Sequence, residues 1–194
     1  ARYMLARNRP TIFRKHDDPQ ARSIELLYER LTELGVAVPE LAEGPLTPTE
    51  CAAAAVRASE AISRHTALNG GARALPVLVL QALRQAHYSA EHVGHSGLAS
   101  AAYLHFTSPI RRYPDLAAHR ALLDALGLGE PSADATELAM EAERSSMTER
   151  AATALERRAD RICLAFLLRD RLRGDANEVF EGEVTGIGEG GAFI

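Results

Sequence analysis

The chain contains one long stretch, from Ala135 to Arg173, that has neither proline nor glycine. At the 1.5 Å rise of an α-helix, a continuous helix over these residues would be about 58 Å long. Asp134 and Glu137 form a capping pair at its start, and Gly174 is a stop signal after its last residue. The sequence therefore predicts a fold with one long helix near its C-terminal end.

Helical patterns also dominate the residues before this stretch. Between 21 and 34 the apolar residues recur at the spacing of one helix face. Thr47, Pro48 and Glu50 then form a typical helix start, with a capping threonine, a first-turn proline and an acid that reaches back. Helices are therefore predicted at 1–8, 21–34, 48–63, 72–86 and 114–126.

The pattern changes after Asn177, where VFEGEVTGIGEGGAFI alternates apolar and polar residues between glycines. Such alternation is typical of β-strands. We place a domain boundary at 174–177 and expect residues 1–175 to form one domain and residues 176–194 to begin another. The predicted fold class is α+β, with a helix-rich part followed by strands.

Charge and composition restrict the function. The net charge is −4, so the chain lacks the basic excess of most nucleic-acid-binding proteins, and such a function would need a local cluster. Two cysteines, Cys51 and Cys163, fit a reducing cytosol and exclude a disulfide framework or a cysteine-rich zinc site. No apolar run approaches the ~20 residues that cross a bilayer, and the charged start ARYMLARNRP does not resemble a signal peptide. We expect a cytoplasmic protein with no membrane partner.

Both ends of the chain suggest a piece of a longer protein. The first eight residues have the pattern of the end of a helix with no cap before it, and residues 190–194 stop inside a strand pattern. We therefore expect the remaining N-terminal part of the same protein to act together with this chain.

The segment HFTSPIRRYPDL, residues 105–116, concentrates the polar chemistry of the chain. Its two prolines stiffen the backbone. Arg111 and Arg112 are adjacent, so their side chains should diverge and only one should face a given site. A guanidinium binds phosphate through two parallel hydrogen bonds, and Pro114 can open a helix whose N-terminus also favours anions. The segment thus combines two phosphate-binding features.

Composition alone favours a simpler interpretation, a solvated loop in which Asp115 pairs with Arg111 or Arg112. A metal-binding role for His105 and His119 is also weaker than a hydrogen-bonded packing role. The reason is that no acid or cysteine lies at metal-ligand spacing from them.

HFTSPIRRYPDLAAHRAL resembles the signature of the RNB-family exoribonucleases, the ribonuclease II and ribonuclease R enzymes. The preceding ALRQAHYSAEHVGHSGLASAAYL is similar to the family's approach to that signature. TALERRADR, within the long helix, is similar to an Ala-Glu-Arg-Asp segment, with Arg158 in place of an acid. EVFEGEVTGIGEGGAFI resembles the first strands of an OB-fold RNA-binding domain. The resemblance covers essentially all 194 residues and implies the C-terminal part of an RNB catalytic domain, then a truncated OB fold.

The resemblance also implies an activity, the hydrolysis of single-stranded RNA from its 3′ end with release of nucleoside 5′-monophosphates at a magnesium site. The family's metal-binding aspartates lie upstream of residue 1 of this chain. The Mg²⁺ ligands are therefore expected outside it, and the chain alone is expected to be inactive. Asp17 and Asp18 lack the spaced carboxylates that two metal ions require, and neither is assigned to metal.

By position, the resemblance assigns Arg111 as the catalytic arginine that holds the scissile phosphate. It assigns Glu156 as an acid that helps to place the terminal nucleotide or to orient that arginine. Further RNA contacts are expected from Thr107, Ser108, Arg112 and Tyr113. Without the resemblance, Glu156 would be interpreted as half of a surface ion pair with Arg157 or with a neighbour of Asp160.

Two functions stay open. A cluster of aspartates upstream of residue 1 favours an exoribonuclease. A natural start at Ala1 favours a non-catalytic RNA-binding or protein-interaction module on the same fold. A purely helical scaffold protein fits the signature least well.

Overall fold

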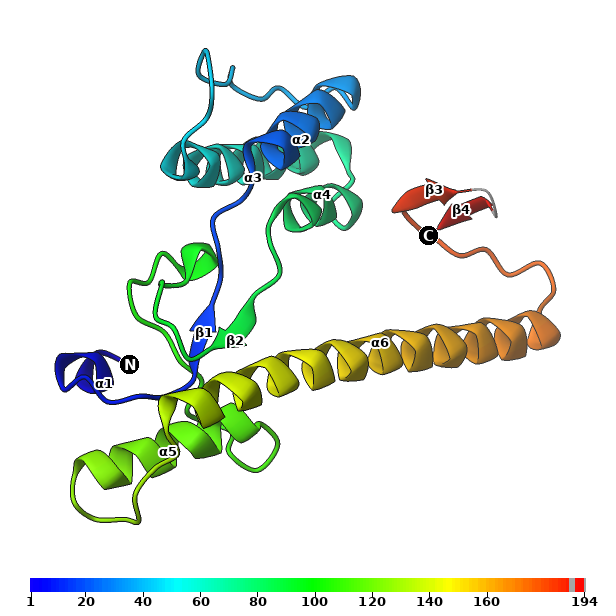
Figure 1. Ribbon diagram of the computed structural model, residues 1–194. Helices are drawn as coiled ribbons and strands as arrows, with labels where there is room; N and C mark the ends of the chain where they lie inside the picture. The colour runs from blue at the N-terminus through cyan, green and yellow to red at the C-terminus, as the bar shows by residue number, and fades with distance from the viewer. Residues whose placement is uncertain (189–190, 194) are drawn as a thin grey trace. The chain divides into compact units, whose positions relative to one another are not determined.

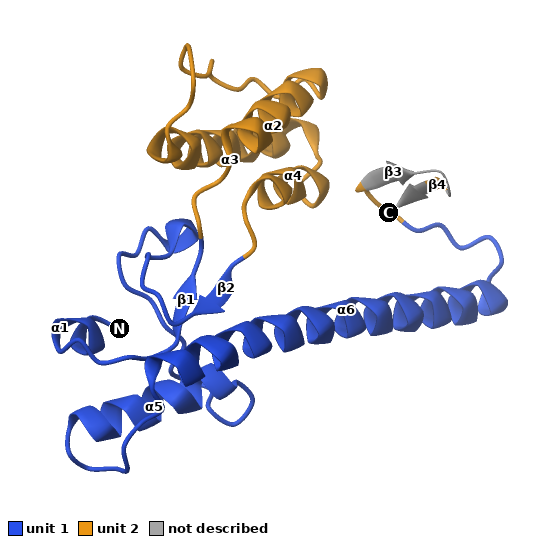
Figure 2. Ribbon diagram, in the orientation of Figure 1, with its two compact units in different colours: residues 1–16, 86–180 blue, residues 17–85, 181–194 orange. Residues whose placement is uncertain are grey.

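The computed structural model describes residues 1–188 and 191–193. The chain divides into two compact units, which Figure 2 distinguishes by colour. Unit 1 consists of residues 1–16 and 86–180, and unit 2 of residues 17–85 and 181–194. All six residues that the sequence assigns to the site belong to unit 1.

Unit 2 is built on three helices, α2 (Ala21–Glu33), α3 (Pro48–Asn69) and α4 (Ala74–Ala82), labelled in Figure 1. The apolar face of α2 buries Ile24 and Leu31 completely, as its spacing predicts. The alanine run of α3 packs against this face, because its small side chains let two helices approach closely. The Tyr28 hydroxyl donates to the carbonyl oxygen of Ala54 at 2.9 Å and ties α2 to α3.

Two of the predicted helix ends in unit 2 need correction. α3 starts with the expected capping box between Thr47 and Glu50, but it runs to Asn69 instead of ending near residue 63. No proline or glycine interrupts it before Gly70. α4 is shorter than the predicted 72–86, because the backbone becomes extended at Leu83.

Two short strands near the C-terminus, β3 (Gly186–Gly188) and β4 (Gly191–Phe193), form an antiparallel pair. Strands are thus present in this region, but they cover only residues 186–188 and 191–193, and residues 178–185, at the start of the alternating pattern, form no strand. Residues 189–190 and 194 lie outside the described part of the chain. Just before β3, the carboxylate of Glu183 accepts hydrogen bonds from the amides of Arg73 and Ala74 at the start of α4. These backbone bonds hold the pKa of Glu183 below its usual value.

Unit 1 contains α1 (Arg2–Ala6), the 3₁₀ turn η1 (Ser96–Leu98), α5 (Tyr113–Ala125) and the long α6 (Ala135–Gly174). It also contains two strands that the sequence patterns did not predict, β1 (Phe13–Lys15) and β2 (His87–Ser89). They pair antiparallel, with Arg14 opposite Tyr88. Each strand is three residues long, too short to show an alternating pattern.

The long helix α6 matches its prediction at both ends. The Asp134 carboxylate caps it by accepting from the amides of Thr136 and Glu137 at 2.8 and 2.9 Å. The buried residues of α6 all lie in its first third, where Leu138 and Ala142 pack in the core of unit 1. None of the helices in the described ranges, α6 included, has the length and apolar character needed to cross a membrane.

A small apolar core joins the parts of unit 1 that carry the predicted site. Ile12, just before β1, and Tyr88 of β2 pack against Ala117 of α5 and against Leu138 and Ala142 of α6. The two strands therefore bring the turn that precedes α5 and the first third of α6 to a common centre.

Candidate functional site

A cleft of about 430 Å³ lies in unit 1 where β2, the turn before α5 and the α6 helix meet. Of the six predicted site residues, Arg111, Arg112, Tyr113 and Glu156 line it, whereas Thr107 and Ser108 do not. The full lining is Tyr88, Arg111, Arg112, Tyr113, Pro114, Ser145, Thr148, Glu149, Ala152, Thr153 and Glu156.

A tight turn in front of α5 presents the two arginines to this cleft. The carbonyl oxygen of Ser108 accepts hydrogen bonds from the amides of Arg111 and Arg112, at 3.2 and 3.1 Å. Arg112 then has an extended backbone and caps α5, with Pro114 in the first turn as predicted. Both polar groups of the Ser108 backbone are used within this segment, since its amide donates to Asp115. Ser108 therefore builds the turn and does not line the cleft.

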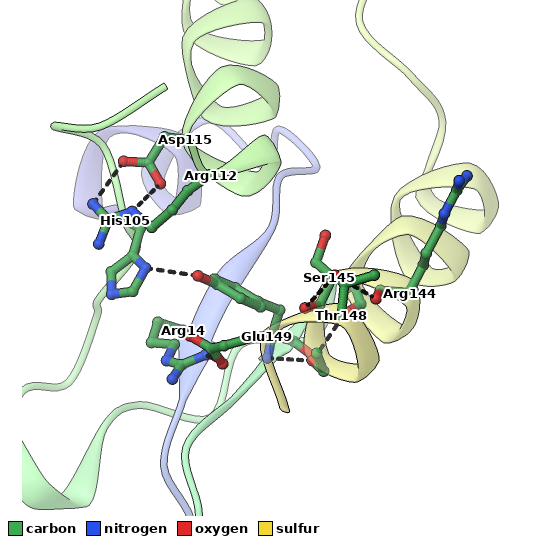
Figure 3. Close-up of polar contacts among 11 residues, drawn as sticks. Arg14, His105, Arg112, Asp115, Arg144, Ser145, Thr148 and Glu149 are labelled. Carbon is green, nitrogen blue, oxygen red and sulfur yellow. Dashed lines mark hydrogen bonds and ion pairs between the residues drawn. The ribbon is translucent and has the colours of Figure 1, made fainter. Parts of the chain in front are cut away.

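Asp115 pairs with Arg112 and is completely buried. Its carboxylate oxygens accept from Nε and Nη2 of Arg112, both at 2.9 Å, and one of them also accepts from the Ser108 amide at 2.8 Å. Burial acts to raise the pKa of Asp115, but these hydrogen bonds outweigh it and leave the pKa below its usual value. Figure 3 shows the two side chains facing each other. The expectation that Asp115 pairs with one of the two arginines is confirmed, and the partner is Arg112.

Arg111 differs from its neighbour in its bonding. Both arginines line the cleft, so the expectation that only one would face a site is wrong. Two nitrogens of Arg112 are bound to Asp115. The Arg111 side chain is exposed and makes no hydrogen bond or ion pair with any residue in the described ranges. Of the two arginines, Arg111 therefore has all its guanidinium donors available for an anion.

The α6 side of the cleft carries two acids, Glu149 and Glu156. Glu149 binds Arg14 of β1 at 2.6 Å, and the Arg14 guanidinium also lies over the Tyr88 ring, 4.5 Å from its centre. Figure 3 shows Arg14 beside Glu149. Glu156 makes no ion pair with any described residue, against the interpretation that pairs it with Arg157. The cleft thus holds one neutralised acid and one available acid.

Sequence reasoning missed Glu149, although a signal for it exists. Glu149 and Glu156 are seven residues apart, about two helical turns, and so lie on one face of α6. Ser145, Thr148 and Thr153 share this face and also line the cleft. Once Glu156 is placed in the site, helical spacing alone brings these residues to it.

A hydrogen-bonded pair, Tyr88 and His105, lies beside the turn that precedes α5. The Tyr88 hydroxyl and His105 Nδ1 are 2.9 Å apart. Burial lowers the pKa of His105, and the nearby charges of Arg112 and Arg14 lower it further. Burial likewise raises the pKa of Tyr88, with the Glu149 charge adding to it. Both groups are therefore held in their neutral forms at neutral pH.

The other histidine of the signature, His119, donates from Nε2 to the carbonyl oxygen of Phe106 at 2.7 Å. Its ring also lies against the Phe106 ring, with centroids 4.1 Å apart. Together with the bond between His105 and Tyr88, this contact confirms the packing role predicted for the two histidines.

The described residues offer no cluster of metal ligands. Within residues 1–188 and 191–193, no three His, Cys, Asp or Glu side chains are grouped so that they could hold a metal ion. Asp17, which the sequence did not assign to metal, lies 3.7 Å from Arg84 in unit 2.

Comparison with known proteins establishes the family. Residues 1–127 match the RNB domain model. Along its whole length, the chain is 30% identical to "Ribonuclease R 1" of Lactococcus lactis and 31% identical to ribonuclease R of Escherichia coli. The chain belongs to the RNB domain family. It spans only 23% and 24% of the lengths of these two relatives.

Solved structures show the same similarity in three dimensions. Ribonuclease R of Mycoplasma genitalium, in complex with ribose-methylated single-stranded RNA, matches with a TM-score of 0.79 and 26% identity. This match covers 100% of the present chain and 29% of that chain. Yeast Ssd1, described as a pseudonuclease, matches 73% of the chain with a TM-score of 0.55 at 19% identity, which shows a shared fold only.

Proposed function

We propose that the full-length protein is a hydrolytic exoribonuclease that degrades single-stranded RNA from its 3′ end and releases nucleoside 5′-monophosphates. The observation that carries this proposal is the cleft in which the guanidinium of Arg111 and the carboxylate of Glu156 both lie, neither of them paired with another residue of the described part of the chain. Membership of the RNB family supports it, as do relatives named ribonuclease R over the whole chain.

Arg111 is proposed to hold the scissile phosphate and to offset the negative charge that grows on it during hydrolysis. A planar guanidinium can donate two parallel hydrogen bonds to phosphate oxygens. Only interactions that strengthen in the transition state raise turnover. A fixed cation aimed at the developing charge is of this kind, because it does not have to reorganise during the reaction.

Glu156 is proposed to place the terminal nucleotide or to orient Arg111 from the α6 side of the cleft. Arg112 is proposed to contact RNA through Nη1, the nitrogen that Asp115 does not bind. Tyr113, 43% exposed in the cleft wall, is suited to contacts with the last nucleotides. Thr107 and Ser108 lie outside the cleft lining. They are still proposed to contact the RNA backbone near its last phosphates.

Mg²⁺ is the proposed metal ion. Its ligands would come from parts of the full-length protein outside this 194-residue chain, since the described residues form no such site. When bound, Mg²⁺ would supply the activated water of a metal-dependent phosphodiester hydrolysis.

Further proposals concern the surroundings of the site. Residues 176–194 are proposed to begin an OB-fold RNA-binding domain after a catalytic part that ends at residue 175. The remaining N-terminal part of the same protein is the proposed partner of this chain. The cytoplasm is the proposed location, which the two unpaired cysteines, Cys51 and Cys163, support.

A non-catalytic RNA-binding or interaction module is the second candidate function. The specific observation in its favour is the fold that the chain shares with the pseudonuclease Ssd1. A cleft that binds single-stranded RNA without cutting it would need the same free arginine.

The experiment that separates these functions uses the full-length protein and single-stranded RNA labelled at its 5′ end. With Mg²⁺ we expect progressive shortening of the labelled strand and release of nucleoside 5′-monophosphates. RNA with a blocked 3′ end should resist, and a chelator should stop the reaction. The isolated 194-residue chain is expected to be inactive under the same conditions. Binding of RNA by the full-length protein with no hydrolysis would favour the non-catalytic module.

A further inference from the structure

We propose that Asp115 is the positioning residue for Arg111, an inference that rests on the proposed function of this cleft. Asp115 lies in the first turn of α5 and has no exposed surface, so it does not line the cleft itself. Any effect that it has on RNA hydrolysis must therefore act through the residues it binds.

Asp115 braces both ends of the turn that carries Arg111. One of its oxygens accepts from the Ser108 amide, at the entry of the turn, and the fork of Arg112 closes on the carboxylate at the exit. Arg111 lies between these two anchors, and its own amide is bonded to the Ser108 carbonyl. A single buried carboxylate thus fixes the backbone on either side of Arg111 and makes no hydrogen bond or ion pair with the Arg111 side chain.

The same bonds decide which arginine stays available. The Asp115 carboxylate forms two hydrogen bonds with Arg112, so the charge of Arg112 balances its own. Asp115 therefore does not compete with phosphate for Arg111. Without the Asp115 carboxylate, Arg112 would be released into the cleft that both arginines line, and the partly buried Ser108 would lose the acceptor of its amide. We therefore expect loss of Asp115 to misplace Arg111, and so to lower turnover by a larger factor than it lowers RNA affinity.

The test is a double-mutant cycle in the full-length protein with the variants Asp115→Asn, Arg111→Ala and the two combined. Turnover and RNA dissociation constants are measured separately on the same single-stranded RNA. Asp115→Asn is expected to lower turnover on the order of tens to a hundredfold, since misplacing a catalytic group by about 1 Å has this effect. RNA affinity should change by much less. In the Arg111→Ala background, Asp115→Asn is expected to lower turnover no further, because its effect passes through Arg111.

The outcomes separate two failures. If Arg111→Ala leaves turnover unchanged, the proposed function of the cleft is wrong. If Arg111→Ala lowers turnover but Asp115→Asn lowers it by the same factor with and without Arg111, then Asp115 has only a structural role and the present inference is wrong.

Asp124→Asn is the matched control. Asp124 lies on the same helix and also accepts hydrogen bonds from an amide and a side chain, those of Ser132, but it does not line the cleft. Its substitution should leave turnover per folded molecule unchanged. If Asp115→Asn does not fold, the pair Arg112→Gln with Asp115→Asn removes both charges together, so that no unpaired charge is left buried. Turnover of that pair is measured at saturating RNA, where the proposed RNA contact of Arg112 does not limit the rate. It should be lowered only when Arg111 is present, and an equal loss without Arg111 would overturn the inference.

Discussion

Arg111, from the turn before α5, and Glu156, from the third helical turn beyond the buried part of α6, line the same cleft. Neither side chain has an ionic partner within the described ranges. Most charged side chains around them are already paired, with Arg112 bound to Asp115 and Arg14 to Glu149. Within the described ranges, the cleft therefore has one cation and one anion without an ionic partner, which is the arrangement expected of groups that bind a ligand.

The two acids of α6 should respond differently to loss of charge. Glu156→Gln is expected to lower turnover about tenfold, equivalent to ~1.4 kcal/mol, without loss of stability, because Glu156 makes no bond in the described structure that the substitution would break. Glu149→Gln, on the same helix face, should destabilise the protein because Arg14 loses its partner. Steady-state kinetics and thermal melting of both variants check this. A melting temperature lowered equally by the two substitutions would contradict the assignment.

The ion pair of Arg14 and Glu149 should be measurable as a coupling free energy. The Arg14 side chain is 13% exposed, so solvent screens the pair less than a surface one. Arg14→Gln is expected to lower the free energy of unfolding by about 1.5–3 kcal/mol, the usual range for a hydrogen bond to a charged group. Urea denaturation of both single variants and the double variant gives the coupling. Strictly additive losses would mean that the two side chains do not stabilise each other.

Ser146 of α6 should be needed to hold β2 in place. Its buried hydroxyl accepts from the Tyr88 amide at 2.9 Å and donates to the carbonyl oxygen of Ala142 at the same distance. Ser146→Ala would leave that amide buried without an acceptor, and we expect a loss of about 1–3 kcal/mol of unfolding free energy. Ser145→Ala is the control, since the buried Ser145 makes no such side-chain bond to β2. Equal losses from the two substitutions would show that the bond to Tyr88 contributes nothing.

Stability should fall in mild acid because of His105. Its pKa in the folded protein is lowered, chiefly by burial and then by Arg112 and Arg14, while Asp115 and Glu149 act in the opposite direction. At pH values above the ordinary histidine pKa of about 6.5, the His105 ring is neutral in both the folded and the unfolded state. Its titration then costs no free energy of unfolding. Below that pKa, the unfolded state binds a proton that the folded state does not, so the free energy of unfolding decreases.

Denaturation of the wild-type protein and of His105→Gln, from about pH 7.5 to about pH 5, tests this titration. The wild type should lose more stability than the variant over that range. The stability of the His105→Gln variant should still fall somewhat over this pH range, because burial also lowers the pKa of His95. Parallel curves for the two proteins would rule out His105 as the titrating group.

The helices were predictable from sequence because their signals are local. The capping residues Thr47 and Asp134 and the absence of proline and glycine after 135 each act within one helix, and the structure bears them out. The strands β1 and β2 were not predictable, because they exist only through pairing between residues far apart in the sequence, such as Arg14 and Tyr88. Three residues of extended chain carry no period of their own.

The sequence indicated which residues form the candidate site, but not which of them are bonded to one another. The signature marked Arg111, and its similarity to a known family marked Glu156, and the structure brings both to one cleft. That Asp115 binds Arg112 and not Arg111 depends on how the Ser108 turn directs two adjacent side chains. Residue types and spacing left that choice open. The neutralisation of Glu149 likewise depends on β1, which no local pattern indicated.

The most direct test of this account is to measure turnover and RNA affinity separately for Arg111→Ala in the full-length protein, with single-stranded RNA and Mg²⁺. Removing one preorganised group that stabilises developing charge typically costs about a hundredfold or more in turnover. We expect a loss of at least that size together with a much smaller change in the RNA dissociation constant. Turnover and affinity reduced by the same factor would show instead that Arg111 only binds RNA.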